Sequence, residues 1–257
     1  MRDMPPIARR GEIAERLADG QTVMASALAD EFGTSEDAIR RDLRALASEG
    51  LCRRVYGGAL PITTRARPLI ERVSENQAAK HALARIAATQ VQPGEFVFLD
   101  SGSTNLELAR VLPNDLELTV ATNSVDIAAI LIRRPDVQTI LVGGLLHPLV
   151  GGSVDADACK VVAQMNIERC FIGVCAISTD SGISAFDSSD ASFKRVLLAS
   201  SRERVALITN DKFTTRAAHR ITPLAGIQTY VVEHDAPLHA VGQLEGADAL
   251  VLKAQAV

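Results

Sequence analysis

One segment limits what this chain can fold into more than any other. It is residues 34–59, TSEDAIRRDLRALASEGLCRRVYGGA, in which five arginines surround a short apolar stripe and a glycine pair follows. Ser35 is a residue type that caps helix N-termini, the next two residues are acidic and complement the helix dipole, and Gly50 is a residue type that ends helices. The sequence therefore predicts a helix over residues 36–49.

The two faces of this predicted helix differ in chemistry. Ile39, Leu43 and Leu46 recur at spacings of four and three, so they share one face. The arginines project around the remaining surface: Arg40, Arg41 and Arg44. One face can therefore pack in a core while the other touches DNA phosphates or bases.

The segment after the helix predicts a β-hairpin. Residues 51–56 are compatible with a strand, and Gly57-Gly58 permits a tight turn close to a phosphate backbone. Arg53 and Arg54 lie on this strand and are candidates for contacts with flanking phosphates. We interpret the hairpin as the wing of a DNA-binding domain.

Two shorter helical segments precede the arginine-rich one. Residues 7–18 and 26–32 carry apolar residues at helical spacing, and residues 23–24 are long enough for a small strand. Three helices and a hairpin predict a winged helix-turn-helix domain over residues 1–60, in which Ser35 and the five arginines contact DNA. The alternative is an ordinary surface helix whose arginines are solvated.

The composition limits which classes of partner the protein is expected to bind. The 257 residues are 47% hydrophobic and 23% charged with a net charge of −4, which suits a globular protein of two unequal domains rather than a wholly basic nucleic-acid binder. The basic signal is clustered in residues 40–54, so DNA affinity is expected to rely also on the avidity of a dimer or tetramer. With no Trp and two Tyr, the chain offers no stacking platform for single-stranded bases, which favours duplex DNA over RNA.

The cysteines and the N-terminus predict a reduced, cytoplasmic protein. The four cysteines include no C-x-x-C pair and no nearby histidine at finger spacing, so we predict neither a metal site nor a disulfide framework. The opening sequence MRDMPPIARR has no apolar signal-peptide core, and no run approaches the roughly 18 apolar residues of a membrane span. We therefore expect no membrane partner.

The remainder of the chain predicts a linker and an α/β domain. A short polar segment bounded by prolines begins a linker over residues 61–75, and residues 76–257 then alternate helical and strand patterns. Helices are predicted over 77–89, 105–112, 125–132, 157–165 and 189–200, and strands over 96–99, 116–121, 137–142, 170–176, 204–208 and 228–232. The strands are nearly continuous apolar runs, which is typical of an open, mostly parallel sheet buried on both faces.

Polar loops follow these strands, at the edge where open α/β sheets bind ligands. The first, called the hydroxyl loop from here on, consists of Asp100, Ser101, Gly102, Ser103 and Thr104. Hydroxyl groups, a glycine and free amides at a helix N-terminus form an anion site suited to a phosphate. The alternative is a capped turn that binds nothing. No P-loop or dinucleotide fingerprint occurs there, so no nucleotide cofactor is predicted.

Other predicted strand ends supply further polar residues. Asn123 lies after one strand, Gly143-Gly144 after the next, and Lys212 after a later one. Lys212 can place a cation opposite the hydroxyl loop. Singly these residues are ordinary loop chemistry, but together they converge on one edge of one sheet.

The arginine-rich segment resembles that of DeoR-type bacterial transcriptional regulators, which runs S-x-x-T-I-R-R-D-L and ends in an arginine and Gly-Gly-Ala. The matching residues here are 35–43 and 54–59. Ala38 stands where the family usually has threonine, and Glu36 and Asp37 add paired acids that face phosphate poorly. The resemblance implies a DNA-binding regulator.

The resemblance covers about residues 7–233. The family's sensor motifs D-S-G-T-T, T-N-S, Gly-Gly, F-I-G and D-x-S-K-F have counterparts at residues 100–104, 122–124, 143–144, 171–173 and 209–213. The family's sensor domain is similar to ribose-phosphate isomerases and glucosamine-phosphate deaminases, and its usual effectors are phosphorylated sugars or related metabolites.

The resemblance also implies roles for individual residues. The hydroxyl loop and Lys212 would hold the phosphate, with Lys80 and Asn123 near the sugar. Thr209 stands where the family usually has aspartate, so we expect the carboxylate beside the family's lysine to be missing.

These observations predict a repressor of a carbohydrate-metabolism operon, acting as a homodimer or homotetramer on double-stranded operator DNA and controlled by a phosphorylated sugar or related metabolite. One alternative is a sugar-phosphate isomerase or deaminase, for which Asp100 and Asp187 are the candidate bases. We predict no catalytic residues, because nothing marks a second acid or a ring-opening histidine. The other alternative is a DNA binder whose second domain only oligomerises.

Overall fold

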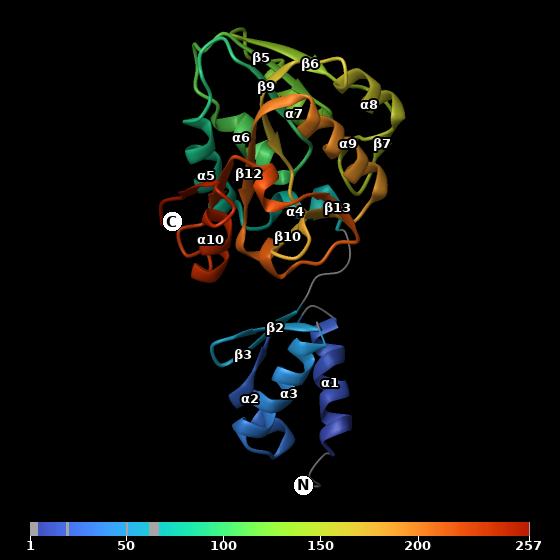
Figure 1. The fold of residues 1–257 in the computed structure, drawn as a ribbon, viewed down its shortest axis with the longest axis vertical. Helices are drawn as coiled ribbons and strands as arrows, with labels where there is room; N and C mark the ends of the chain where they lie inside the picture. Colours follow the sequence, from blue (N-terminus) through green and yellow to red (C-terminus); the bar gives the residue numbers. More distant parts are fainter. Residues whose placement is uncertain (1–4, 19–20, 50, 62–66, 257) are drawn as a thin grey trace. The chain divides into compact units, whose positions relative to one another are not determined.

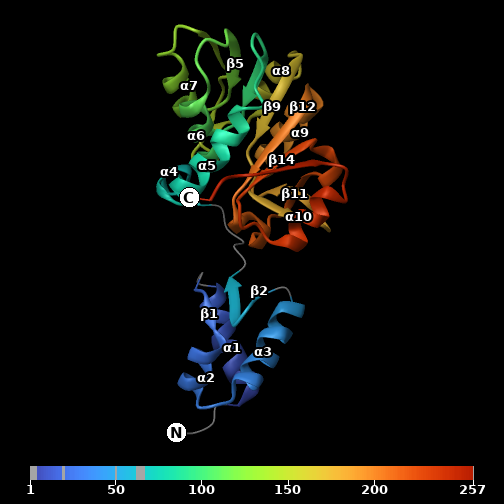
Figure 2. The same cartoon turned by 90° about the vertical axis from the view of Figure 1, so that its left-hand side faces the viewer.

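The structure, a computed structural model, describes residues 5–18, 21–49, 51–61 and 67–256, except the side chain of Arg53. It divides into two compact units whose main boundary falls between residues 64 and 65 (Figures 1 and 2). Within the described ranges, no helix is long and apolar enough to cross a membrane.

The N-terminal unit is a winged helix-turn-helix, which confirms the prediction. Its elements are α1 (Pro6–Ala18), β1 (Val23–Met24), α2 (Ala25–Phe32), α3 (Glu36–Ser48), β2 (Cys52–Val55) and β3 (Gly58–Pro61). The strands form an antiparallel sheet in the order β1-β3-β2, and β2 and β3 are the wing. The apolar face of α3 lies in the core, where Ile39, Leu43 and Leu46 are at most 2% exposed.

Local sequence signals set the turns of this unit. Gly33 ends α2 in the left-handed conformation (φ +62°), and the Ser35 side chain caps α3 by accepting a hydrogen bond from a first-turn amide at 3.2 Å. In the wing, Gly57 has a φ of +80°, and a Cβ on Gly58 would lie 2.0 Å from the Val23 carbonyl oxygen. The glycine pair is therefore required by both the turn and the close approach of β1.

The second unit is built on a seven-stranded parallel sheet, which confirms the predicted fold class. The strand order is β15-β14-β12-β9-β4-β5-β6. The strands are β4 (Phe96–Leu99), β5 (Leu118–Thr122), β6 (Val137–Leu141), β9 (Ile167–Ile172), β12 (Ser201–Ile208), β14 (Thr229–Val232) and β15 (Leu250–Lys253). Successive residues enter cores on opposite faces, as Phe98 and Leu99 do on β4.

Helices cover both faces of this sheet (Figure 2). One core is shared with α5 (Gln77–Ala88), α6 (Ser103–Val111) and α7 (Val125–Leu131), and the other with α8 (Ala156–Val162), α9 (Ser188–Ala199) and α10 (Leu238–Glu245). The smaller elements are the β7–β8 hairpin (Leu146–His147 and Gly152–Ser153), the antiparallel strands β10 (Ala176–Ser178), β11 (Gly182–Ala185) and β13 (His219–Thr222), and the 3₁₀ turns η1 (Asn210–Thr214) and η2 (Leu224–Gly226).

Some elements differ from the predictions. Residues 69–74, predicted as part of the linker, form α4 (Leu69–Ser74), whose Leu69 is buried. The predicted strand 170–176 is two separate elements, β9 and β10. The β7–β8 hairpin, β11, β13, α10 and β15 were not predicted at all. Except for the mainly apolar β15, the strands among them contain polar residues or glycine, and α10 contains Gly242, a weak helix former.

An ion pair is buried in the N-terminal unit. Arg9 Nε lies 2.7 Å from Asp42 Oδ2, which joins α1 to α3, and each residue is 5% exposed. Removing one partner of such a pair leaves the other charge buried without its counter-charge.

Asp42→Ala is therefore expected to destabilise the N-terminal unit by about 3–5 kcal/mol. Asp37→Ala is the matched control, because Asp37 lies on the same helix and its side chain is 84% exposed. Its ion pair with Arg40 is exposed, and such a pair contributes about 1 kcal/mol at most to stability. Amide hydrogen exchange of α3 peptides in the full chain measures both effects. Equal losses of protection in the two variants would show that the buried pair does not stabilise this unit.

Candidate functional site

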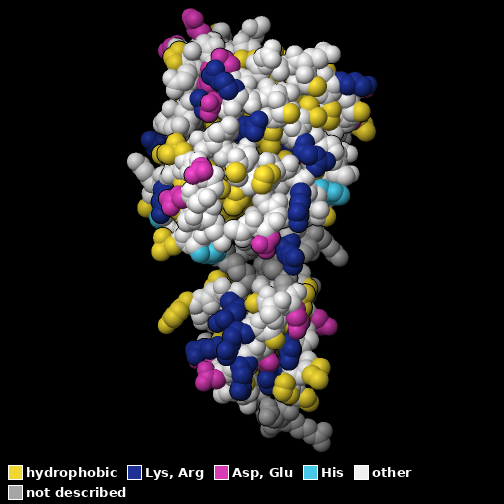
Figure 3. All heavy atoms as spheres, viewed as in Figure 1, with side chains coloured by type: hydrophobic (Ala, Val, Ile, Leu, Met, Phe, Trp, Pro, Cys, Tyr) yellow, Lys and Arg dark blue, Asp and Glu magenta, His cyan; other side chains and the backbone are white. Residues whose placement is uncertain are grey.

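The exposed side of α3 and the wing form the candidate DNA surface. Arg40, Arg41 and Arg44 on α3 and Arg54 on β2 are all exposed, and arginine side chains, dark blue in Figure 3, gather over these elements. Ser35 is exposed too, but its hydroxyl oxygen caps α3. The side chain of Arg53 lies outside the described part of the chain.

Arg40 is occupied by carboxylates of its own helix. Its Nη2 lies 2.6 Å from Glu36 Oε2, and its Nη1 lies 3.4 Å from Asp37 Oδ1. The acids that the sequence places in the first turn of α3 therefore offset the charge of Arg40. A DNA phosphate that binds Arg40 has to compete with both of them.

Tyr56 is a candidate DNA contact that was not predicted. It lies in the turn between β2 and β3, and it is fully exposed, although large aromatic side chains are usually half-buried or more. The sequence feature that could have indicated this role is its position, because Tyr56 is the one aromatic residue of segment 51–61.

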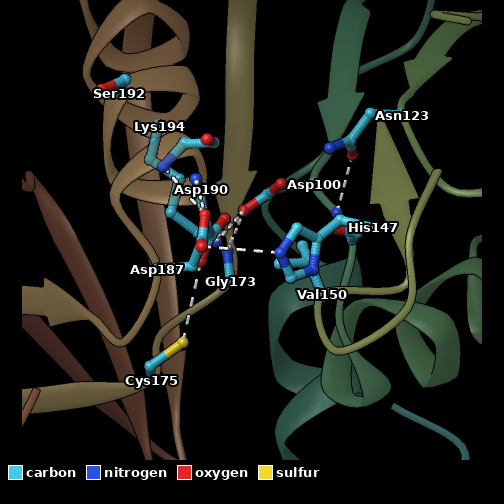
Figure 4. Close-up of polar contacts among 12 residues, drawn as sticks. Asp100, Asn123, His147, Val150, Gly173, Cys175, Asp187, Asp190, Ser192 and Lys194 are labelled. Atoms are coloured by element: carbon cyan, nitrogen blue, oxygen red, sulfur yellow. Dashed lines mark hydrogen bonds and ion pairs between the residues drawn. The ribbon is translucent and has the colours of Figure 1, made fainter. Parts of the chain in front are cut away.

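In the second unit, loops that are distant in the sequence meet at the C-terminal ends of β4, β5 and β9 (Figure 4). The Ser101 N–H donates to Asn123 Oδ1 at 2.9 Å, and the Gly173 N–H donates to Asp100 Oδ2 at 2.8 Å. Asn123 Nδ2 in turn donates to the Ser153 carbonyl at 3.1 Å. The structure thus brings the hydroxyl loop and Asn123 together.

The hydroxyl loop ends in the first turn of α6. Gly102 stands at the N-cap and has no side chain to accept from the first-turn amides, which include those of Ser103 and Thr104. Ser101 is 4% exposed, and its hydroxyl has no hydrogen-bond partner among the described residues. A buried hydroxyl beside uncapped amides is chemically suited to an anionic acceptor.

A buried charge cluster beside this loop was not predicted. Lys194 Nζ contacts the Asp190 carboxylate and lies 3.4 Å from Asp100 Oδ2, and all three side chains are at most 3% exposed. Burial raises the pKa of Asp100. Burial alone would lower the pKa of Lys194, but the two carboxylates raise it. In the sequence, Asp190 and Lys194 are an i,i+4 pair of a kind that is usually solvated.

The carboxylate expected to be missing beside Lys212 is present, and this expectation was wrong. Asp211 Oδ2 lies 2.8 Å from Lys212 Nζ, and the Thr209 side chain hydrogen-bonds Asp211. Although burial alone would raise the pKa of Asp211, Lys212 and these hydrogen bonds lower it. In this chain the carboxylate beside Lys212 comes from Asp211, two positions after Thr209.

Lys80, predicted near the sugar, is buried, and its ammonium group is occupied. It donates to the Glu75 carbonyl at 2.6 Å and also to the Arg72 carbonyl. Burial lowers the pKa of Lys80, and the positive charge of Lys212 acts in the same direction. Lys80 therefore lies within electrostatic range of Lys212, but its donors point at the backbone around α4.

Asp187, a candidate base of the enzyme alternative, caps a helix. Its Oδ1 accepts from the amides of Ser189 and Asp190, at 2.8 and 3.0 Å, at the start of α9. Its Oδ2 lies 3.5 Å from His147 Nε2, as Figure 4 shows. Both oxygens thus have structural partners.

Both units match one protein family. Residues 9–65 match the DeoR-like helix-turn-helix domain, and residues 75–234 match the DeoR C terminal sensor domain. The chain is 29% identical to the glycerol-3-phosphate regulon repressor of Escherichia coli K12, over 83% of this chain and 85% of that protein. It is 31% identical to the transcriptional repressor AccR of Agrobacterium fabrum, over 80% and 81%.

Among solved structures, ribose 5-phosphate isomerase A of Methanocaldococcus jannaschii is similar over 54% of this chain and 55% of that one, at 14% identity and a TM-score of 0.40. The two sequence relatives are both named as repressors. With a DNA-binding domain and a sensor domain of one family in succession, the chain belongs to the DeoR family of DNA-binding transcriptional regulators.

Proposed function

We propose that this regulator represses a carbohydrate-metabolism operon and that a phosphorylated sugar or related metabolite controls its operator affinity. The observation that carries the proposal is the buried Ser101 hydroxyl, which has no partner among the described residues and lies beside the uncapped start of α6. The name of the Escherichia coli relative, a glycerol-3-phosphate regulon repressor, supports a phosphorylated effector.

In this proposal the phosphate accepts hydrogen bonds from the Ser101 hydroxyl and from the Ser103 and Thr104 amides. The start of a helix carries partial positive charge, which stabilises an anion there. Lys212, in η1 after β12, supplies an opposing positive charge that its pairing with Asp211 partly offsets. Lys194 offsets the buried carboxylate of Asp100, so the anion is not repelled from the loop.

Control of the operator requires that the effector bind two arrangements of the protein with different affinity. A coupling free energy of about 1–3 kcal/mol changes operator affinity about 5- to 150-fold. We further propose a homodimer or homotetramer, because two-fold symmetry matches paired half-sites and avidity supplements a modest basic charge.

A thermal-shift panel of ribose 5-phosphate, glucosamine 6-phosphate and glycerol 3-phosphate, each with its unphosphorylated form, tests the sensor. We expect a phosphorylated compound alone to stabilise the protein, by about 2.7 kcal/mol at 100 times its Kd. Lys212→Met should remove this stabilisation. Lys160→Met should keep it, since that side chain on α8 is 74% exposed. Equal stabilisation by the unphosphorylated compounds would contradict the proposal.

Arg54→Ala is expected to weaken binding to a selected operator duplex and to a scrambled duplex alike, because we propose that Arg54 contacts phosphate. The slope of log affinity against log salt should fall by about one for one lost contact. Fluorescence anisotropy at several salt concentrations measures it, with Arg85→Ala, an exposed arginine on α5, as the control. A loss confined to the selected operator would assign Arg54 to base recognition instead.

A further inference from the structure

We infer that the β7–β8 hairpin connects the hydroxyl loop to α4 and transmits effector occupancy, with Arg72 and Lys80 as positioning residues rather than effector contacts. This inference rests on the proposed function. In the chain, α4 is the first helix after the segment that joins the two units. A shift of α4 would therefore reach the DNA-binding unit through the segment of chain that joins the two units.

One side of the hairpin lies against the proposed effector site. A Cβ on Gly152 would lie 2.7 Å from Ser101 Cβ and 2.9 Å from the Asn123 carbonyl oxygen. The Ser153 N–H donates to that carbonyl at 3.0 Å, and Asn123 Nδ2 donates back to the Ser153 carbonyl at 3.1 Å. Because close-packed interiors transmit displacement, a shift of Ser101 or Asn123 moves the hairpin.

The other side of the hairpin lies against α4. Gly151 has a φ of +80°, and a Cβ there would lie 2.1 Å from Leu69 Cδ2. Arg72 Nη2 donates to the Leu149 carbonyl at 2.9 Å and reaches the Val150 carbonyl at 3.5 Å. An apolar contact and a guanidinium clamp therefore hold the hairpin and α4 together.

Lys80 holds the end of α4 from a further element, α5. It projects from α5, is 6% exposed, and donates to the carbonyls of Arg72 and of Glu75, the C-cap of α4. Burying an ammonium group is costly unless it is hydrogen-bonded, so these carbonyls hold the end of α4 in place. Arg72 therefore makes two connections: its side chain donates to the hairpin, and its carbonyl oxygen accepts from Lys80.

The hairpin also touches the other side of the proposed effector site. His147 Nε2 lies 3.5 Å from Asp187 Oδ2, and Asp187 caps α9, the helix that carries Asp190 and Lys194. One small element is therefore in contact with the hydroxyl loop, α9 and α4. An element whose arrangement both sites bias is a physical basis for coupling between them.

Arg72→Ala tests the signalling role. In this variant, the affinity for the effector and the operator affinity without effector should stay within about twofold of the wild-type values. The effect of the effector on operator affinity, about 5- to 150-fold in the wild type, should fall toward one. Thermal shift and anisotropy with the three phosphorylated probes measure these quantities. Arg134→Ala is the matched control, because Arg134 also donates to two successive carbonyls, Leu112 at 2.7 Å and Pro113 at 2.6 Å, beside the start of β6. It should keep the coupling.

Gly152→Ala tests the connection without any ligand. Amide hydrogen exchange of residues 69–75 should become faster, because the added methyl group pushes the hairpin from Ser101. Gly143→Ala should change nothing, since a Cβ there meets no atom within 4 Å. Unchanged exchange in Gly152→Ala, or full coupling in Arg72→Ala, overturns the inference. A wild type that binds a probe without changing operator affinity instead overturns the proposed function.

Discussion

The proposed effector site depends on Lys194, a buried cation between carboxylates from two different elements. Asp100 follows β4, Asp190 lies in the first turn of α9, and either would be costly to bury without this counter-charge. Asp100 also accepts from the Gly173 N–H, and a Cβ on Gly173 would lie 2.7 Å from the Ser101 carbonyl oxygen. The charge cluster thus fixes how β4, β9 and α9 meet, and it positions the hydroxyl loop between them.

Most of the scaffold could be predicted, because it rests on periodicity and caps that are local in the sequence. The predicted strand 96–99 is β4, and the predicted helix 36–49 differs from α3 by one residue at its end. The short antiparallel elements could not be predicted in the same way. Unlike β4, which is a continuous apolar run, these strands mix apolar residues with polar residues or glycine, and their pairing with one another supplies the stability that their own sequence lacks.

The candidate site could be predicted where its residues form one contiguous motif, as in the hydroxyl loop. Lys194 could not be found, because a lysine four residues after an acid is usually a solvated pair and only the tertiary fold buries it. Thr209 and Asp211 show a second limit. Position 209 holds threonine, so the sequence motif predicts a missing acid, whereas in the structure the carboxylate of Asp211 reaches Lys212. Lys80 shows a third limit, because the backbone carbonyls that accept its hydrogen bonds cannot be identified from the sequence.

The charges on α3 bear on how the operator is held. Arg40 already has carboxylates of Glu36 and Asp37 within 3.4 Å, so a DNA phosphate that bound Arg40 would replace an existing partner. An exposed pair is worth about 1 kcal/mol or less, which permits the exchange but reduces its gain. A net charge of −4 provides no long-range compensation. In the proposed homodimer or homotetramer, linked subunits that engage paired half-sites together would supply the remaining affinity. Operator occupancy would then depend on the spacing of the DNA-binding units, the quantity on which the proposed effector would act.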